Sequence, residues 1–100
     1  MATTTQRVRG TTDVKKLSNS IYHSLFETGK SIVRSVGAGA LNQATKGIIL
    51  TINRCKEENL HVKIVDIRFV TLDNERSGKE GETISAIEHE LISIEHEEKK

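Results

Sequence analysis

The chain has 100 residues, 35% of them hydrophobic, and its 15 Lys/Arg and 14 Asp/Glu leave a formal net charge of +1. This composition excludes a wholly disordered chain, and it predicts one folded domain over residues 1–100 with flexible tails at 1–5 and 97–100. A lone Cys55 excludes an intrachain disulfide, and no apolar run suits a signal peptide or a membrane span, so we expect a cytoplasmic protein without membrane contact.

The N-terminal part of the chain predicts a strand followed by a helix. Residues 6–9 form a short strand candidate that Gly10 ends. One of residues 11–13, all of which carry capping side chains, begins a helix whose apolar residues recur at steps of three and four between Val14 and Leu25. Gly29 stands where a helix C-terminal cap is expected.

A second strand and a second helix follow. Residues 31–36 predict a strand that runs directly into Gly37-Ala38-Gly39. We expect the helix to begin near Ala40 and to end at about Glu58. Its apolar stripe comprises Leu41, Ala44, Ile48, Ile52 and Cys55. A cysteine on such a stripe is expected to be a buried, inert thiol.

The C-terminal part predicts a β-hairpin. Residues 61–72 are rich in strand formers, residues 73–81 are polar and carry glycines, and residues 82–95 form a last strand with a bulge near Leu91. The order β-α-β-α-β-β indicates a two-layer α/β fold, a four-stranded mixed sheet with two helices on one face. So short a chain cannot bury all of its apolar surface by itself. A second subunit would help to cover what remains, so we expect a homodimer.

The junction between the second strand and the second helix is the most distinctive stretch, Gly37-Ala38-Gly39-Ala40-Leu41-Asn42-Gln43-Ala44. Its glycines permit a close backbone approach, and the helix that follows offers unpaired N–H groups to an anion. It is not a dinucleotide fingerprint, because Asn42 stands where the third glycine would be. A tight structural turn and an anion contact both remain open at this point.

Residues Val36–Lys46 resemble the signature of the stage V sporulation protein S family, and the element order over residues 6–95 resembles that of the wider Alba superfamily. The resemblance implies an Alba-like two-layer fold, a homodimer, and binding of DNA or RNA. It further implies that the loop before the first helix and the closing hairpin embrace the nucleic acid. A bacterial protein of this kind would be associated with the nucleoid, and a eukaryotic one would be nuclear or cytoplasmic.

The resemblance also assigns candidate residues. Lys15 and Lys16 correspond to lysines between the first strand and the first helix of Alba proteins, and Arg76 and Lys79 correspond to the basic hairpin arm. The chain departs from archaeal Alba where Ala38 or Ala40 replaces a basic residue, and acidic residues 75, 80 and 82 dilute the charge of the arm. The full set of candidate nucleic-acid-binding residues is Arg9, Lys15, Lys16, Gly37, Gly39, Asn42, Gln43, Lys46, Arg76 and Lys79.

The charge distribution gives partial support to this set. Residues 1–56 hold nine Lys/Arg and two acidic residues, whereas residues 57–100 hold six Lys/Arg and twelve acidic residues. The basic half suits a polyanion, although a simply solvated surface explains most charge runs. Only three aromatic residues are present, so phosphate contacts are favoured over base stacking.

No pattern supports catalysis, a cofactor or a metal. The four histidines lack metal-ligand spacing, and we expect them to be solvated or on strand faces. We interpret Glu88, Glu90, Glu95, Glu97 and Glu98 as a solubilising edge. The chain is therefore predicted to be a non-enzymatic, dimeric nucleic-acid-binding protein. The alternatives are a regulatory or scaffold protein of the sporulation-protein-S type that acts through protein partners and, less favoured, a small-molecule-binding module built on the Gly37–Gly39 turn.

Overall fold

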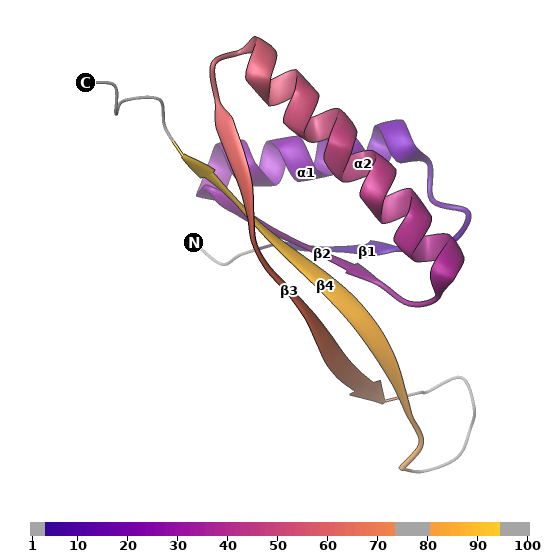
Figure 1. Ribbon diagram of the computed structural model, residues 1–100. Coiled ribbons are helices and arrows are strands. Elements are labelled where there is room, and N and C mark those ends of the chain that lie inside the picture. Colours follow the sequence, from indigo (N-terminus) through magenta and orange to yellow (C-terminus); the bar gives the residue numbers. More distant parts are fainter. Residues whose placement is uncertain (1–3, 74–80, 95–100) are drawn as a thin grey trace.

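The computed structural model describes residues 4–73 and 81–94. Along the chain, two helices alternate with strands and a long hairpin closes the fold (Figure 1). The elements are β1 (Thr4–Val8), α1 (Val14–Thr28), β2 (Lys30–Ser35), α2 (Ala38–Glu57), β3 (His61–Asp73) and β4 (Thr83–Ile94).

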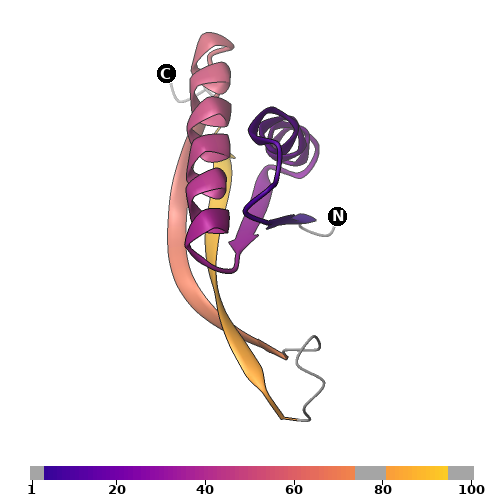
Figure 2. The same cartoon turned by 90° about the vertical axis from the view of Figure 1, so that its right-hand side faces the viewer.

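The four strands form one mixed sheet in the order β1-β2-β4-β3. β1 and β2 are parallel, and the β2–β4 and β3–β4 pairs are antiparallel. Both helices lie on the same side of the sheet, and β3 and β4 extend beyond them as an arm (Figures 1 and 2). The predicted two-layer α/β fold is therefore confirmed.

One predicted boundary was wrong at the N-terminal end of the sheet. Thr4 and Thr5, expected in a flexible tail, lie in β1 and pair with Ser31 and Ile32 of β2. A short parallel strand is ordered by its neighbour more than by its own composition, which explains the error. α2 begins at Ala38, two residues before the expected start. The predicted tail at 97–100 lies outside the described residues.

The caps of α1 were predicted correctly. The Asp13 carboxylate accepts a hydrogen bond from the Lys16 backbone N–H at 3.0 Å, which satisfies one of the unpaired donors of the first turn. At the other end, Gly29 has φ of 80°, and its N–H donates to the Leu25 carbonyl at 2.8 Å. A left-handed residue at this place favours glycine.

The core lies between the helices and the sheet. Ile21 and Leu25 of α1 pack with Val33 of β2 and Leu91 of β4, and each is at most 2% exposed. α2 presents its small residues to this core, so the stripe is rotated from the one expected: Leu41 and Ile52 are half-buried, whereas Ala40 and Thr51 are buried. The full buried set of α2 is Ala40, Ala44, Gly47, Ile48, Thr51 and Cys55.

The bulge lies in β3 rather than in β4. The register shifts between Ile64 and Asp66, opposite Leu91 and Glu90, so the unpaired residue is Val65. Buried residues of β4 do not alternate regularly along the strand, because both faces of β4 are covered. Leu91 faces the helices, whereas Glu88 is buried by ion pairs on the opposite face.

An ionic row crosses the sheet face that points away from the helices. Glu88 is only 5% exposed, and its carboxylate accepts hydrogen bonds from Arg34 Nε at 2.8 Å and Arg68 Nε at 3.1 Å. Glu90 binds Arg68 Nη1 at 2.9 Å and Lys30 Nζ at 3.4 Å. The interpretation of Glu88 and Glu90 as a solubilising edge was therefore wrong: they join β4 to both of its neighbours. Glu95, Glu97 and Glu98 lie outside the described residues.

Candidate nucleic-acid interface

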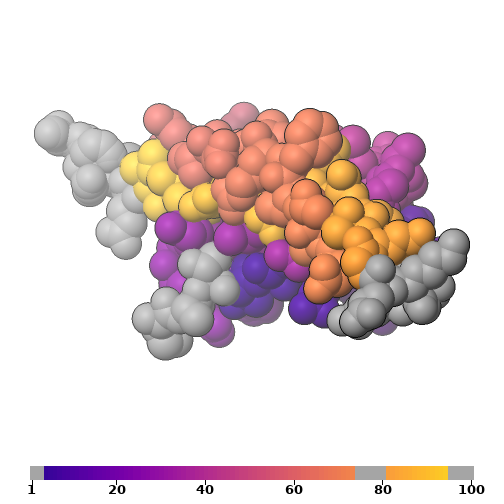
Figure 3. Space-filling model, turned by 90° about the horizontal axis from the view of Figure 1, so that it is seen from below, coloured from indigo at the N-terminus to yellow at the C-terminus, as the bar shows by residue number. Residues whose placement is uncertain are grey.

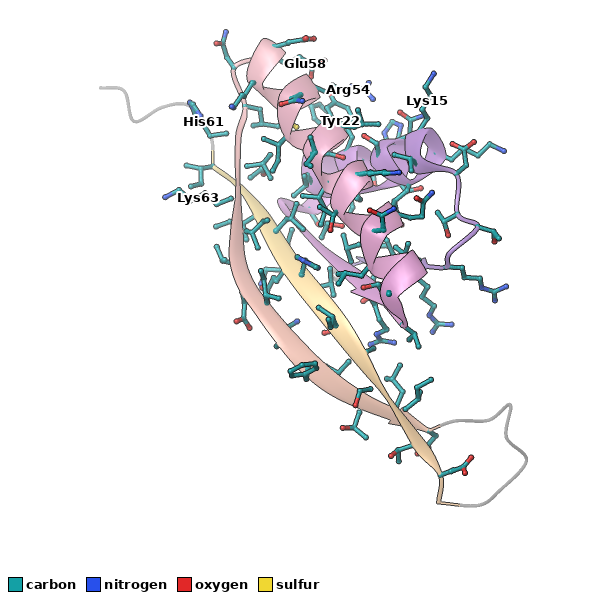
Figure 4. The ribbon with its side chains drawn as sticks, turned by 45° about the vertical axis from the view of Figure 1, so that its right-hand side comes forward. Lys15, Tyr22, Arg54, Glu58, His61 and Lys63 are labelled. Atoms are coloured by element: carbon teal, nitrogen blue, oxygen red, sulfur yellow. The ribbon has the colours of Figure 1, made fainter. Side chains whose placement is uncertain are left out.

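The loop between β1 and α1 is a hydrogen-bonded turn that presents basic residues. The Arg9 N–H donates to Thr12 Oγ1 at 2.7 Å, and the Thr12 N–H donates to the Arg9 carbonyl at 3.1 Å. The next residue, Asp13, caps α1, so Lys15 and Lys16 lie in the first turn of this helix. The side chains of Arg9, Lys15 and Lys16 are exposed, and Lys15 stands at the start of α1 in Figure 4.

The N-terminus of α2 carries no compensating side chain. Gly37 precedes the helix with φ of 92°, a conformation that favours glycine, and no side chain caps the first turn. The first turn also contains no acidic residue, so the positive end of the helix dipole is not neutralised locally. Gly37, Ala38 and Gly39 are exposed. The glycine-rich junction is therefore a tight turn that leads into a helix N-terminus without a side-chain cap.

These two loops contact each other. Gly10 and Gly39 face each other at close range, because a Cβ added to Gly39 would already be in van der Waals contact with the Gly10 Cα, at 3.6 Å. The Gln43 side chain strengthens the contact, because its Nε2 donates to the Thr12 carbonyl at 2.8 Å. The β1–α1 loop and the start of α2 thus form one surface, which we call the loop surface and define as residues 9–16 and 37–43.

The candidate residues divide into three groups. Arg9, Lys15 and Lys16 lie on the loop surface with the exposed glycines, and Gln43 is half-buried between the loops. Asn42 and Lys46, four residues apart, share one exposed side of α2. Arg76 and Lys79 lie outside the described residues. Within residues 4–73 and 81–94, no ion pair occupies Arg9, Lys15, Lys16 or Lys46.

Other basic side chains are engaged within the fold. The Arg54 guanidinium lies 3.7 Å from the centre of the Tyr22 ring, and it binds Asn19 Oδ1 at 3.0 Å. The Tyr22 hydroxyl donates to Glu58, and this bond raises the pKa of the phenol (Figure 4). Arg34 and Arg68 are held by carboxylates. Arg54, Arg34 and Arg68 are therefore structural cations and poor candidates for phosphate contact.

Sequence reasoning did not foresee one feature of the site, the support of the β1–α1 loop by Gln43. The bond between Gln43 and Thr12 joins residues 31 apart in the chain. No local pattern reveals such a contact.

An apolar strip runs along β3, the edge strand beside β4. Ile64, Val65, Ile67 and Phe69 form this β3 strip and are 41%, 48%, 59% and 79% exposed, respectively. Ile64, Ile67 and Phe69 lie opposite Leu91, His89 and Ile87, which puts them on the face that carries the helices. Ile49 of α2 is 51% exposed as well. Side chains of β3 and β4 make up much of the surface in Figure 3.

Residues 4–73 and 81–94 contain neither a metal-ligand cluster nor a membrane-spanning helix. No group of three or more His, Cys, Asp or Glu side chains there could hold a metal ion. Neither helix is long and apolar enough to cross a membrane. Cys55 is buried as expected, and burial raises the pKa of its thiol.

Comparison with known proteins agrees with the resemblance seen at residues 36–46. Residues 4–92 match the model of the family described as Stage V sporulation protein S (SpoVS). No curated protein matches the chain. Among solved structures, Alba from Thermoplasma volcanium matches with a TM-score of 0.64 and 18% sequence identity, covering 88% of this chain and 98% of that chain. This likeness establishes an Alba-like fold.

Proposed function

The chain belongs to the stage V sporulation protein S family, and from this premise and its Alba-like fold we propose that it is a non-enzymatic, cytoplasmic homodimer that binds DNA or RNA. Binding is the function that the Alba resemblance implies, and contact runs through the phosphate backbone. Residues 1–100 act as a single domain in this proposal. No cofactor takes part.

The observation that carries the proposal is the loop surface. The β1–α1 loop and the first turn of α1 carry three exposed cations, Arg9, Lys15 and Lys16, and this loop is hydrogen-bonded to α2, whose N-terminus has no side-chain cap. No ion pair within the described residues occupies the three cations. Positive side chains and the uncapped N–H groups of a helix both suit phosphate oxygens. Such contacts release counterions, so binding is expected to depend strongly on salt and weakly on sequence.

Dimerisation completes the proposal. The β3 strip exposes four large apolar side chains on an edge strand, and a second copy of the chain would remove them from water. Two loop surfaces would then engage one nucleic acid together, which raises the effective affinity of each. The hairpin residues Arg76 and Lys79 remain a prediction, because they lie outside the described residues.

A salt titration tests this function. The triple variant Arg9→Ala/Lys15→Ala/Lys16→Ala should keep its fold, since all three side chains are exposed. Its affinity for duplex DNA or single-stranded RNA should fall. The slope of log affinity against log salt should shrink by about 0.9 per lost duplex contact, or by about 0.7 on a single strand.

The matched control is Lys56→Ala, an exposed lysine in the last turn of α2, at the end opposite to the loop surface. It should leave both affinity and salt slope unchanged. The proposal fails if the parent shows no salt-dependent binding to either polymer. It also fails for these residues if the triple variant binds like the parent with the same slope.

The second candidate is a regulatory or scaffold protein that acts through protein partners. The observation that favours it is the internal pairing of Lys30, Arg34, Arg54 and Arg68, which withdraws these cations from any polyanion. The net charge of +1 points the same way. If the parent protein does not bind nucleic acid even at low salt, the result would support this candidate.

A further inference from the structure

The Gln43 side chain links α2 to the β1–α1 loop through its hydrogen bond to the Thr12 carbonyl. We infer that Gln43 is a positioning residue: its side-chain amide fixes the β1–α1 loop against α2, so that Arg9 is held ready for a phosphate. This inference rests on the proposed function and gives two residues of the loop surface different roles. Arg9 makes the contact, and Gln43 holds the backbone that carries it.

The contacts form a short chain from Gln43 to Arg9. Gln43 Nε2 donates to the Thr12 carbonyl at 2.8 Å, and Thr12 in turn holds Arg9 through two hydrogen bonds, 2.7 Å to its Oγ1 and 3.1 Å from its N–H. The adjoining Gly10 lies close to Gly39, with no room for more than a methyl group between the two backbones, and the Gln43 hydrogen bond adds a second link between the loop and α2. Removing the Gln43 donor leaves the Thr12 carbonyl without this hydrogen bond, so the β1–α1 loop loses its side-chain link to α2.

The same contacts argue against a direct role for Gln43 in binding. One N–H of its side-chain amide already donates to the Thr12 carbonyl, and the side chain is half-buried between the loops. Arg9, by contrast, is exposed, and no ion pair or side-chain hydrogen bond holds its guanidinium within the described residues. A flexible cation of this kind loses conformational entropy on binding, and a fixed backbone reduces that loss.

A double-mutant cycle tests the inference. Gln43→Met preserves length and volume but removes the donor, and Arg9→Ala removes the cation. Because a net hydrogen bond contributes about 1 kcal/mol, Gln43→Met should weaken nucleic-acid binding roughly three- to tenfold. In the Arg9→Ala background the same substitution should have almost no further effect, since there is no cation left to position.

Amide hydrogen exchange supplies a readout that does not depend on binding. Gln43→Met should speed exchange at the Arg9 and Thr12 amides, while amides in the middle of α1 keep their protection. The control is Thr45→Ala, which removes a comparable hydrogen bond (Thr45 Oγ1 to the Leu41 carbonyl, 2.9 Å) that stays within α2. It should change neither loop exchange nor affinity.

The outcomes separate the inference from the proposed function. If the parent binds and the effects of Gln43→Met and Arg9→Ala simply add, Gln43 contacts the polymer itself or only stabilises the fold, and the inference is overturned while the function stands. Unchanged exchange at Arg9 and Thr12 in Gln43→Met overturns it as well. If the parent binds no nucleic acid, the proposed function fails, and the phosphate role of Arg9 fails with it.

Discussion

His89 is a buried titratable side chain in the middle of β4. It is 8% exposed and lies opposite Val33 and Ile67 on the helix-bearing face, and its Nδ1 finds no hydrogen-bond partner among the described residues. Burial lowers the pKa of its imidazole below the usual 6.5, because the charged form loses its hydration. The folded protein therefore contains a neutral imidazole that the unfolded chain would protonate more readily.

The expected consequence is a loss of stability in mild acid. Between the ordinary pKa of histidine and the lowered one, the unfolded state binds more protons, so the free energy of unfolding falls as pH drops below about 6.5. The slope cannot exceed about 1.4 kcal/mol per pH unit for a single group. Urea unfolding at pH 7.5, 6.5 and 5.5 measures it. His89→Leu should flatten this dependence, and an equally steep variant would show that another group is responsible.

At the scale of elements, the two helices depend on a glycine at their crossing. A Cβ built on Gly47 of α2 would lie 2.7 Å from Leu17 Cδ2 and 2.9 Å from Leu17 Cγ. Leu17 is 5% exposed and has little room to move. Beside it, Ser18 Oγ and Thr51 Oγ1 are hydrogen-bonded at 2.9 Å across the same crossing. Small residues thus allow α1 and α2 to approach closely.

Gly47→Ala is therefore expected to destabilise the protein. Alanine improves intrinsic helix propensity by about 1 kcal/mol, but overpacking a buried site costs roughly 1–3 kcal/mol. We expect a net loss on the order of 1 kcal/mol in the free energy of unfolding, measured by urea denaturation. The control Lys46→Ala, at the exposed neighbouring position, should have little effect. A more stable Gly47→Ala variant would contradict the close crossing.

The elements differ in how far the sequence determines them. α1 was predictable because its cap at Asp13 and its apolar spacing are local signals. The start of β1 was not, since Thr4 and Thr5 are ordered by pairing with β2. In the candidate site, the exposed cations follow from residue type, whereas the support of their loop by Gln43 and the burial of Glu88 arise only when distant segments meet.

For the whole molecule, the asymmetry of the sheet indicates where a partner would bind. At the β1 edge the sheet ends in a short strand with one buried side chain, Val8. At the other edge β3 has 13 residues, and the four apolar side chains of the β3 strip along it are exposed. Solvated apolar side chains of this size on one long edge strand favour association between copies of the chain.

Ile67→Asp tests this association directly. Ile67 is central in the β3 strip and 59% exposed, so a charge there should not disturb the core of one subunit but would be buried without a partner in a dimer. We expect light scattering to show a dimer for the parent and a monomer for the variant. The variant should also bind nucleic acid more weakly, because it loses the gain from two linked loop surfaces. Thr71→Asp, exposed on the same strand and face but beyond the strip, should remain dimeric. A parent that is monomeric at high micromolar concentration would refute the dimer and assign the β3 strip to a different partner.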